Sequence, residues 1–348
     1  MIGTDGVPAR RGIRWRPTTP AVTLLLLAPL VGEVLNGATR LSFIFAFLPQ
    51  IMVWGCGTLI IREAVHRWKG AAPSRILMGL ALSAIVEVLV LQTSVAPLPW
   101  LQLASIPVYD RIWGVNWFWF AFMLAYEAVW IVLVPILITE LAFPERRADA
   151  WIGGRGLAVA MTVFSVGSIA LWAIWTQSAV PVAFHQPKYW PPRSTLLLGA
   201  AGVGLLVVAA YAVRNAGHET RMSSKAPAPW LAGVVAAAFA APWWTLVVLV
   251  FVPAPSIPVW LPLIAAAIWA CAAYLVFARW SASKTWNDRQ RWTVAFSALL
   301  VCMAMGYLGS TLWPTIDLVA KIVFNLVAAL WMIALGRIVW RRTQKDGL

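Results

Sequence analysis

Three glutamates lie inside long apolar runs of the sequence, at Glu33, Glu87 and Glu127. A charged side chain at the bilayer centre costs roughly 2.5–3.5 kcal/mol on insertion scales, so an acid kept there is a candidate functional group. Such a carboxylate can serve as the base of a hydrolase or as a proton-coupling group. One buried acid is equally well explained as a structural, protonated or hydrogen-bonded group. Three acids in one half of the chain favour a shared site.

Other polar residues recur near these acids at helical spacing. Pro29, Glu33 and Arg40 share one helix face, and the missing N–H of Pro29 predicts a local kink. Asn116 and Glu127 are eleven positions apart, which places them about 20° apart around a helix axis. We therefore predict three candidate catalytic acids, Glu33, Glu87 and Glu127, and four candidate substrate-binding residues, namely Asn36, Arg40, Gln92 and Asn116.

The elements that must position these residues are transmembrane helices. Of the 348 residues, 61% are hydrophobic and 11% are charged, against about 25% charged in soluble domains. Apolar runs of about 20 residues predict an all-α, polytopic integral membrane protein with about ten spans and no soluble domain. We expect spans at about 20–37, 43–65, 76–94, 116–142, 156–178, 194–213, 230–252, 258–278, 293–312 and 317–340. An N-terminal bundle, 1–142, would carry the site, and a C-terminal bundle, 143–348, would be scaffold or lipid-facing.

The basic residues fix the expected orientation. Lys and Arg number 27 against 13 Asp and Glu, and they concentrate on every second loop. Positive loops stay in the cytoplasm, so both termini are expected there, in a multi-pass protein of the plasma (inner) membrane. The expected partners are anionic lipid headgroups at the cytoplasmic face rather than nucleic acid.

Two pairs of charged residues near span ends are interpreted as structural ion pairs: Arg62 with Glu63, and Asp317 with Lys321. Lys321 would extend to the interface. Neither the cysteines nor the Arg62-Glu63-x-x-His66 run has metal-ligand spacing, so no metal and no cofactor is predicted.

The stretch 95–115 is rich in Pro and aromatic residues. We interpret it as an outer interfacial segment or a lid over the acids. Tryptophans at predicted span ends, such as Trp113 and Trp151, are expected in interfacial belts.

A resemblance to known families rests on four segments: LLLAPLVGEVLNG, WGCGTLIIREAVHRW, IVEVLVLQTSVAP and NWFWFAFMLAYEAVWIVLVPILITELAFPERR. Together they resemble, over roughly residues 20–160, a group of uncharacterised multispanning proteins of high-GC Gram-positive bacteria. That group is in turn similar to the CPBP intramembrane proteases, of the CaaX-protease and bacteriocin-processing type.

The CPBP pattern is E-E-x-x-x-R on one helix and F-x-x-x-H on a later one. Glu87 matches its first Glu, while Val88 and Gln92 replace the second Glu and the Arg. Phe118 matches the Phe, and Phe122 stands at the His. The resemblance therefore implies a degenerate hydrolase site that lacks the histidine.

Three functions remain open at this point. The first is a CPBP-like scaffold with residual or lost hydrolase chemistry around Glu87 and Glu127, which binds a peptide or lipid-like ligand. The second is a proton-coupled secondary transporter, although the acids sit in one half of the chain only. The third is a non-catalytic membrane assembly or regulatory protein.

Overall fold

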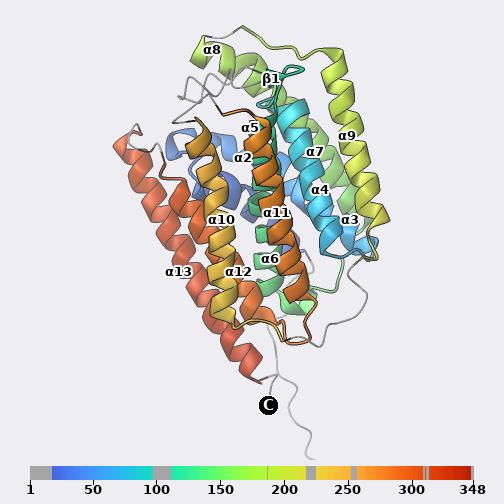
Figure 1. The fold of residues 1–348 in the computed structure, drawn as a ribbon, viewed down its shortest axis with the longest axis vertical. Helices are drawn as coiled ribbons and strands as arrows, with labels where there is room; N and C mark the ends of the chain where they lie inside the picture. The colour runs from blue at the N-terminus through green and yellow to red at the C-terminus, as the bar shows by residue number, and fades with distance from the viewer. Residues whose placement is uncertain are drawn as a thin grey trace, which may run out of the picture.

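The apolar runs of the sequence form helices. The computed structural model describes residues 18–96, 111–185, 187–216, 225–251, 257–308, 310 and 313–345. They form a bundle of mainly long helices that run along a common direction (Figure 1). The predicted all-α class is therefore confirmed.

The first half of the chain supplies short helical elements separated by π-helical or 3₁₀ segments, which are labelled η. In chain order they are α1 (Thr19–Pro29), η1 (Leu30–Leu35), η2 (Leu41–Ala46), α2 (Phe47–Gln50), η3 (Ile51–Gly55), α3 (Cys56–Arg67), α4 (Ala72–Ala84), η4 (Ile85–Val90), α5 (Trp117–Tyr126), η5 (Glu127–Leu133) and α6 (Val134–Ala142). The α-helix α1 ends at Pro29 and continues directly as the π-helical segment η1.

The second half contains longer and more regular helices. They are α7 (Gly154–Ile174), α9 (Arg193–Ala212), α10 (Pro229–Phe251), α11 (Trp260–Ser281), α12 (Asp288–Met305) and α13 (Thr315–Lys345). The short segments η6 (Pro144–Arg146), η7 (Trp175–Ala179) and α8 (Val180–Phe184) lie between them. The predicted ninth span, 293–312, ends seven residues beyond α12, which ends at Met305 with Gly306 as its C-cap. An added Cβ at Gly306 would lie 1.6 Å from the carbonyl oxygen of Asn36, so another chain segment already occupies that space.

Seven helices in the described ranges are long and apolar enough to cross a membrane: Leu41–Arg67, Ala72–Val90, Trp117–Ala142, Gly154–Val182, Arg193–Ala212, Trp260–Ser281 and Thr315–Gln344. Two shorter apolar helices are Thr19–Leu35 and Pro229–Trp244. Each coincides with a span predicted from the sequence. Many large apolar side chains on α7, α9, α11 and α13 are exposed, as expected of surfaces that face lipid.

The predicted lid, 95–115, lies largely outside the described residues. Its last part forms a two-stranded antiparallel hairpin, β1 (Arg111–Ile112) with β2 (Val115–Asn116), at one end of the bundle (Figure 1). Trp113 at the turn is 86% exposed, as expected of an interfacial tryptophan. Trp151, which was also expected in a belt, is instead fully buried.

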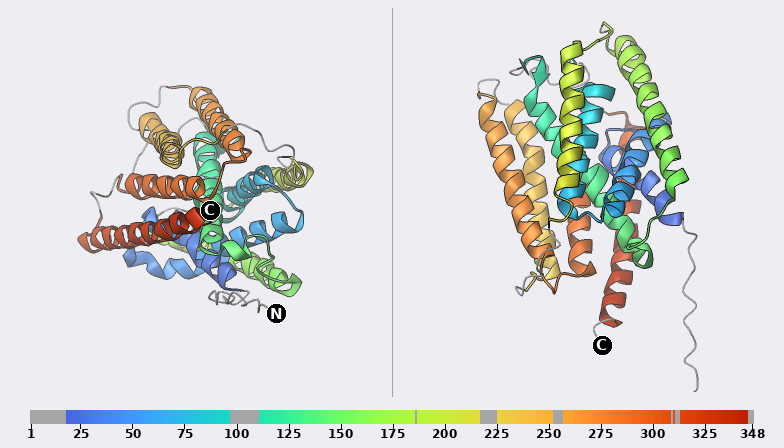
Figure 2. Two further views of the ribbon diagram at one scale, coloured as in Figure 1. Left: turned by 90° about the horizontal axis from the view of Figure 1, so that it is seen from below. Right: turned by 90° about the vertical axis from the view of Figure 1, so that its right-hand side faces the viewer.

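The segment from α5 to α6 forms the centre of the bundle. Viewed along the helices, it lies between the blue and cyan N-terminal helices and the orange and red C-terminal ones (Figure 2). One core cluster joins both sides, because Val31 and Tyr126 pack in it with Ala298 and Met332. The core therefore continues across the predicted boundary at residue 142.

Candidate functional site

Each of the three candidate acids lies in a π-helical segment. Glu33 is in η1, Glu87 is in η4 and Glu127 begins η5. π-Helical turns are rare, and they appear frequently at functional sites. The three positions that sequence reasoning selected therefore share an unusual backbone as well as a residue type.

Small residues let these segments approach one another closely. A Cβ added at Gly32 would meet Ile131 of η5 at 2.3 Å, and one added at Gly79 would meet Ala128 at 3.1 Å. Consequently η1 and α4 both pack directly against η5. The carboxylates come close enough to act on one another electrostatically: Glu87 acts on both other acids, and Glu33 also acts on Glu127.

Glu87 is fully buried, and one of its oxygens is held by two hydroxyl groups. Thr93 donates a hydrogen bond to Oε2, and Ser94 Oγ donates to the same atom at 3.0 Å. The chain can fold back in this way because Gln92 adopts a left-handed conformation with φ 59°. The other oxygen, Oε1, is buried and has no hydrogen-bond partner among the described residues.

Glu127 is held in the same manner from a different side. The indole Nε1 of Trp54, in η3, donates to Glu127 Oε1 at 3.1 Å. Thr58 fixes the neighbouring backbone, since its hydroxyl donates to the Ile131 carbonyl at 3.0 Å. Glu127 Oε2 is buried without a partner in the described part of the chain. Each of the two deeply buried acids thus has one oxygen held by a hydrogen bond and one that accepts none with good geometry, while Trp119 and Ser83 lie near the Glu87 and Glu127 carboxyl groups respectively.

Glu33 differs from the other two because it is only partly buried. Its carboxylate forms no hydrogen bond or ion pair with the described residues, but its segment is tied down at the main chain. The Tyr126 hydroxyl donates to the carbonyl of Gly32, and Cys302 Sγ lies 3.8 Å from that of Val31. Cys302 belongs to α12, so the C-terminal half contributes to the position of Glu33.

The four predicted substrate-binding residues divide into two groups. Asn116 and Gln92 lie beside Glu87. The Asn116 backbone N–H donates to the Ser94 carbonyl at 2.8 Å, and its side chain caps α5 by accepting from Trp119 N at 3.0 Å. Gln92 is buried, and its Oε1 has no partner among the described residues.

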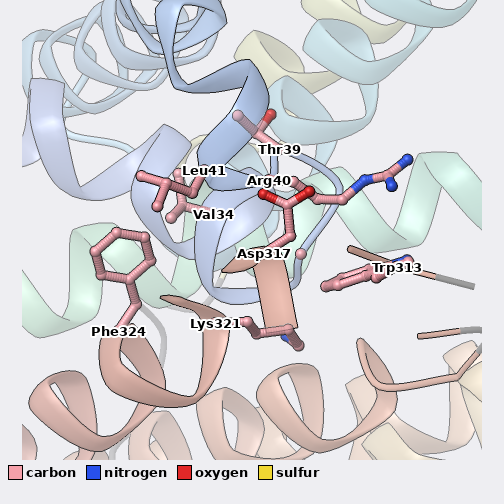
Figure 3. A pocket seen from close by; sticks show the side chains of 9 residues that line it. Val34, Thr39, Arg40, Leu41, Trp313, Asp317, Lys321 and Phe324 are labelled. Carbon is pink, nitrogen blue, oxygen red and sulfur yellow. The ribbon is translucent and has the colours of Figure 1, made fainter. Parts of the chain in front are cut away.

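Arg40 and Asn36 lie elsewhere, beside the start of α13. Arg40 lines a small hollow that contains none of the three glutamates, and its guanidinium lies 5.4 Å from the Trp313 ring centroid. The hollow is lined by Val34, Gly37, Thr39, Arg40, Leu41, Trp313, Asp317, Lys321 and Phe324 (Figure 3).

The structure replaces the predicted pair of Asp317 and Lys321 with two separate interactions. Asp317 accepts hydrogen bonds from the backbone N–H and the hydroxyl of Ser42, at 2.9 and 2.8 Å. Lys321 is 3% exposed rather than extended to the interface, and its Nζ donates to the carbonyls of Leu35 and Asn36 at 2.8 Å each. Those carbonyls lie at the C-terminal end of the first helical segment, where the helix dipole favours a cation.

The other predicted pair is present. Arg62 and Glu63 form an ion pair of 2.6 Å, with 1% and 0% of their side chains exposed. Trp151, which stacks beneath the Arg62 guanidinium at 3.8 Å, donates its backbone N–H to Glu63 at 3.0 Å. This ion pair is therefore buried inside the bundle.

Sequence reasoning missed four donors around the acids. Trp54 and Thr93 donate to Glu127 and Glu87 themselves, and Trp119 and Tyr126 donate to neighbouring groups. Trp119 Nε1 donates to the Thr93 hydroxyl at 3.2 Å and so extends the contacts around Glu87. The sequence did contain one indication of these donors, because Trp54 and Tyr126 lie well inside apolar runs. A buried indole or phenol there usually requires a hydrogen-bond acceptor.

Within the described residues, no group of three or more His, Cys, Asp or Glu is placed to hold a metal ion. The chain matches no protein-family model, and it matches neither a curated protein nor a solved structure. The site therefore has to be interpreted from its own geometry, and the similarity to CPBP proteases stays a prediction.

Proposed function

We propose that this chain is a multi-pass protein of the plasma membrane, with ten spans and cytoplasmic termini. We further propose that Glu87 and Glu127 form the acid–base pair of a membrane hydrolase. Its substrate would be a peptide or lipid-like molecule that carries a carbonyl group. The observation that supports this proposal is the pair of unpartnered oxygens, Glu87 Oε1 and Glu127 Oε2, in one electrostatically linked cluster.

The proposed chemistry requires one ionised and one protonated carboxyl group. Two like charges close together in a low-dielectric interior disfavour double ionisation, so one group is ionised and the other carries a proton. The ionised carboxylate takes a proton from water as the water oxygen bonds to the substrate carbonyl carbon. The protonated group then gives its proton to the leaving group as the bond between the carbonyl carbon and that group breaks.

The fixed oxygens suit this role. The two hydroxyls on Glu87 Oε2 and the indole on Glu127 Oε1 restrict rotation of each carboxyl group, so that the free oxygens keep their direction. Phe122 stands at the position of the CPBP histidine, and it stacks with Tyr126 and Trp243 in the core. This position therefore supplies no acid–base group. Glu127 is the group that would replace that histidine.

The test is hydrolysis of membrane-protein and prenylated-peptide substrates by the purified chain. Glu87→Gln and Glu127→Gln keep the size of each side chain and remove its acid–base function. Each should lower kcat by about 10²–10⁴-fold. Glu145→Gln, at an exposed acid of η6, is the matched control and should leave the rate unchanged. Activity that is indifferent to Glu87→Gln refutes the proposal.

One observation favours proton-coupled transport as a second function. Each of the first four apolar helices contains a π-helical segment, η1, η3, η4 or η5, and three of these segments carry the acids. The segments η3 and η5 interrupt their helices, whereas η1 and η4 end theirs. Interrupted helices around buried carboxylates are typical of transporter binding sites. Proton-coupled uptake into vesicles that is lost in Glu33→Gln or Glu127→Gln would support this function. If both assays are negative for the wild-type chain, the non-catalytic assembly role is favoured.

A further inference from the structure

We propose that Arg111 is a positioning residue for Glu87, on which it acts through the chain segment 93–96. This inference rests on the proposed function, because it adds a further residue to the same hydrolytic site. Arg111 begins the hairpin at one end of the bundle (Figure 1). Hydrogen bonds on both sides of the segment 93–96 join the hairpin to the carboxyl group of Glu87.

The hairpin is closed by a tight turn of two residues. Trp113 and Gly114 lie between its strands, with φ of 53° and 78°. Positive φ at both central positions is characteristic of a type I′ turn, whose twist matches that of antiparallel strands. In the resulting register Arg111 lies opposite Asn116. These two residues therefore stand together at the base of the hairpin, away from its turn.

The base of the hairpin binds three consecutive carbonyl groups of the segment. The backbone N–H of Asn116 donates to the Ser94 carbonyl at 2.8 Å. The Arg111 guanidinium donates to the carbonyl of Val95 and, at 3.1 Å, to that of Ala96. Val95 and Ala96 are 2% and 5% exposed, so their carbonyls depend on protein donors. The planar guanidinium can hold several acceptors in a fixed geometry.

The hydroxyl groups of the same segment hold the acid. Those of Thr93 and Ser94 both donate to Glu87 Oε2, the second at 3.0 Å. Trp119 Nε1 donates to the Thr93 hydroxyl at 3.2 Å, and Trp119 N donates to the side chain of Asn116 at 3.0 Å. The base of the hairpin and the two hydroxyl groups on Glu87 are therefore parts of one network.

No regular helix or strand fixes the segment itself, because η4 ends at Val90. The chain reverses at Gln92 with φ 59°, which is uncommon for a residue other than glycine. Such a conformation persists only where the surrounding contacts impose it. Arg111 supplies part of these contacts. Its loss should let the two hydroxyl groups move relative to the carboxyl group that they hold.

The first test measures hydrolysis by the full-length wild type, Arg111→Gln and Arg193→Gln. Arg193 is an exposed arginine at the start of α9, so Arg193→Gln is the matched control and should leave the rate unchanged. Arg111→Gln should lower kcat about 10²-fold, the effect of displacing a reacting group by about 1 Å. KM should change little, because the displaced acid acts in the transition state. Arg111→Lys keeps the charge without the planar guanidinium, so it should recover part of the rate.

An infrared titration with acid makes a second test that does not depend on turnover. The carboxyl C=O band of Glu87 is identified by its absence from Glu87→Gln. A hydrogen bond weakens the C=O bond that accepts it, so loss of the hydroxyl donors should move this band to higher wavenumber in Arg111→Gln. The band should stay in place in Arg193→Gln.

The two tests separate this inference from the proposed function. If the wild-type chain hydrolyses no substrate but the band shifts in Arg111→Gln, the hydrolase proposal fails and the positioning of Glu87 by Arg111 stands. Arg111→Lys replaces Arg111→Gln in both tests if only the lysine variant folds. If the variant that folds has the rate and the band position of Arg193→Gln, the positioning role of Arg111 is overturned.

Discussion

Replacing Glu63 by glutamine tests how much of the stability of this bundle depends on charges buried at its end. Glu63 is 0% exposed and accepts from Arg62 at 2.6 Å and from the Trp151 backbone at 3.0 Å. The substitution keeps the volume but leaves the Arg62 guanidinium, which is 1% exposed, without its counter-charge. Removal of one partner from a buried ion pair costs about 3–5 kcal/mol.

We expect the lower end of this range, about 3 kcal/mol. Arg62 keeps two other interactions, a hydrogen bond to the Arg147 carbonyl at 3.0 Å and its stacking on Trp151 at 3.8 Å. These contacts compensate only part of the lost charge pair.

The assay is unfolding in mixed micelles with increasing SDS, followed by tryptophan fluorescence. The free energy of unfolding is compared between the wild type, Glu63→Gln and the control Glu145→Gln. The double substitution Arg62→Met with Glu63→Gln removes both charges, and it should recover much of the loss. If Glu63→Gln is no less stable than Glu145→Gln, the pair is not buried as described and the reasoning fails.

Three further predictions use the same unfolding measurement. Lys321→Met removes the donor to two buried carbonyls at the end of η1 and should cost about 3 kcal/mol, whereas Lys284→Met, at an exposed lysine, should be neutral. Gly306→Ala puts a Cβ 1.6 Å from a backbone oxygen and should cost about 3 kcal/mol or more, or prevent folding. Gly202→Ala, in α9 with no atom within 4 Å of the new Cβ, should instead stabilise by about 0.5–1 kcal/mol. Trp54→Phe removes the donor to Glu127 and should cost about 1–3 kcal/mol; an unchanged stability would show that this hydrogen bond is not formed.

The sequence predicted the helices well because the signal for each is local. A run of about 20 apolar residues is sufficient to predict a membrane helix. Every predicted span overlaps a helix in the described ranges, and seven of these helices are long and apolar enough to cross a membrane. The cost of a charge in hydrocarbon also singled out Glu33, Glu87 and Glu127. These inferences need no knowledge of which helices are neighbours.

The sequence did not predict the contacts made by residues distant in the chain. Lys321 and Asp317 are four positions apart and were expected to pair, yet each binds a different part of the segment after η1. Trp151 was expected in an interfacial belt, but it is buried beneath Arg62. In both cases a buried polar group takes the partner that the packing supplies, which helical spacing does not reveal.

The sequence by itself determined that this chain is a helical membrane protein with acids retained in its first apolar segments, because hydrophobicity and the cost of burying charge are properties of the residues. Only the tertiary structure decided that the three acids lie together in π-helical turns, with one oxygen of Glu87 and one of Glu127 held and the other left unpartnered. That arrangement depends on close helix approach at small residues such as Gly32 and on a chain reversal at Gln92. Both are properties of the packed chain, since they require segments far apart in the sequence to meet.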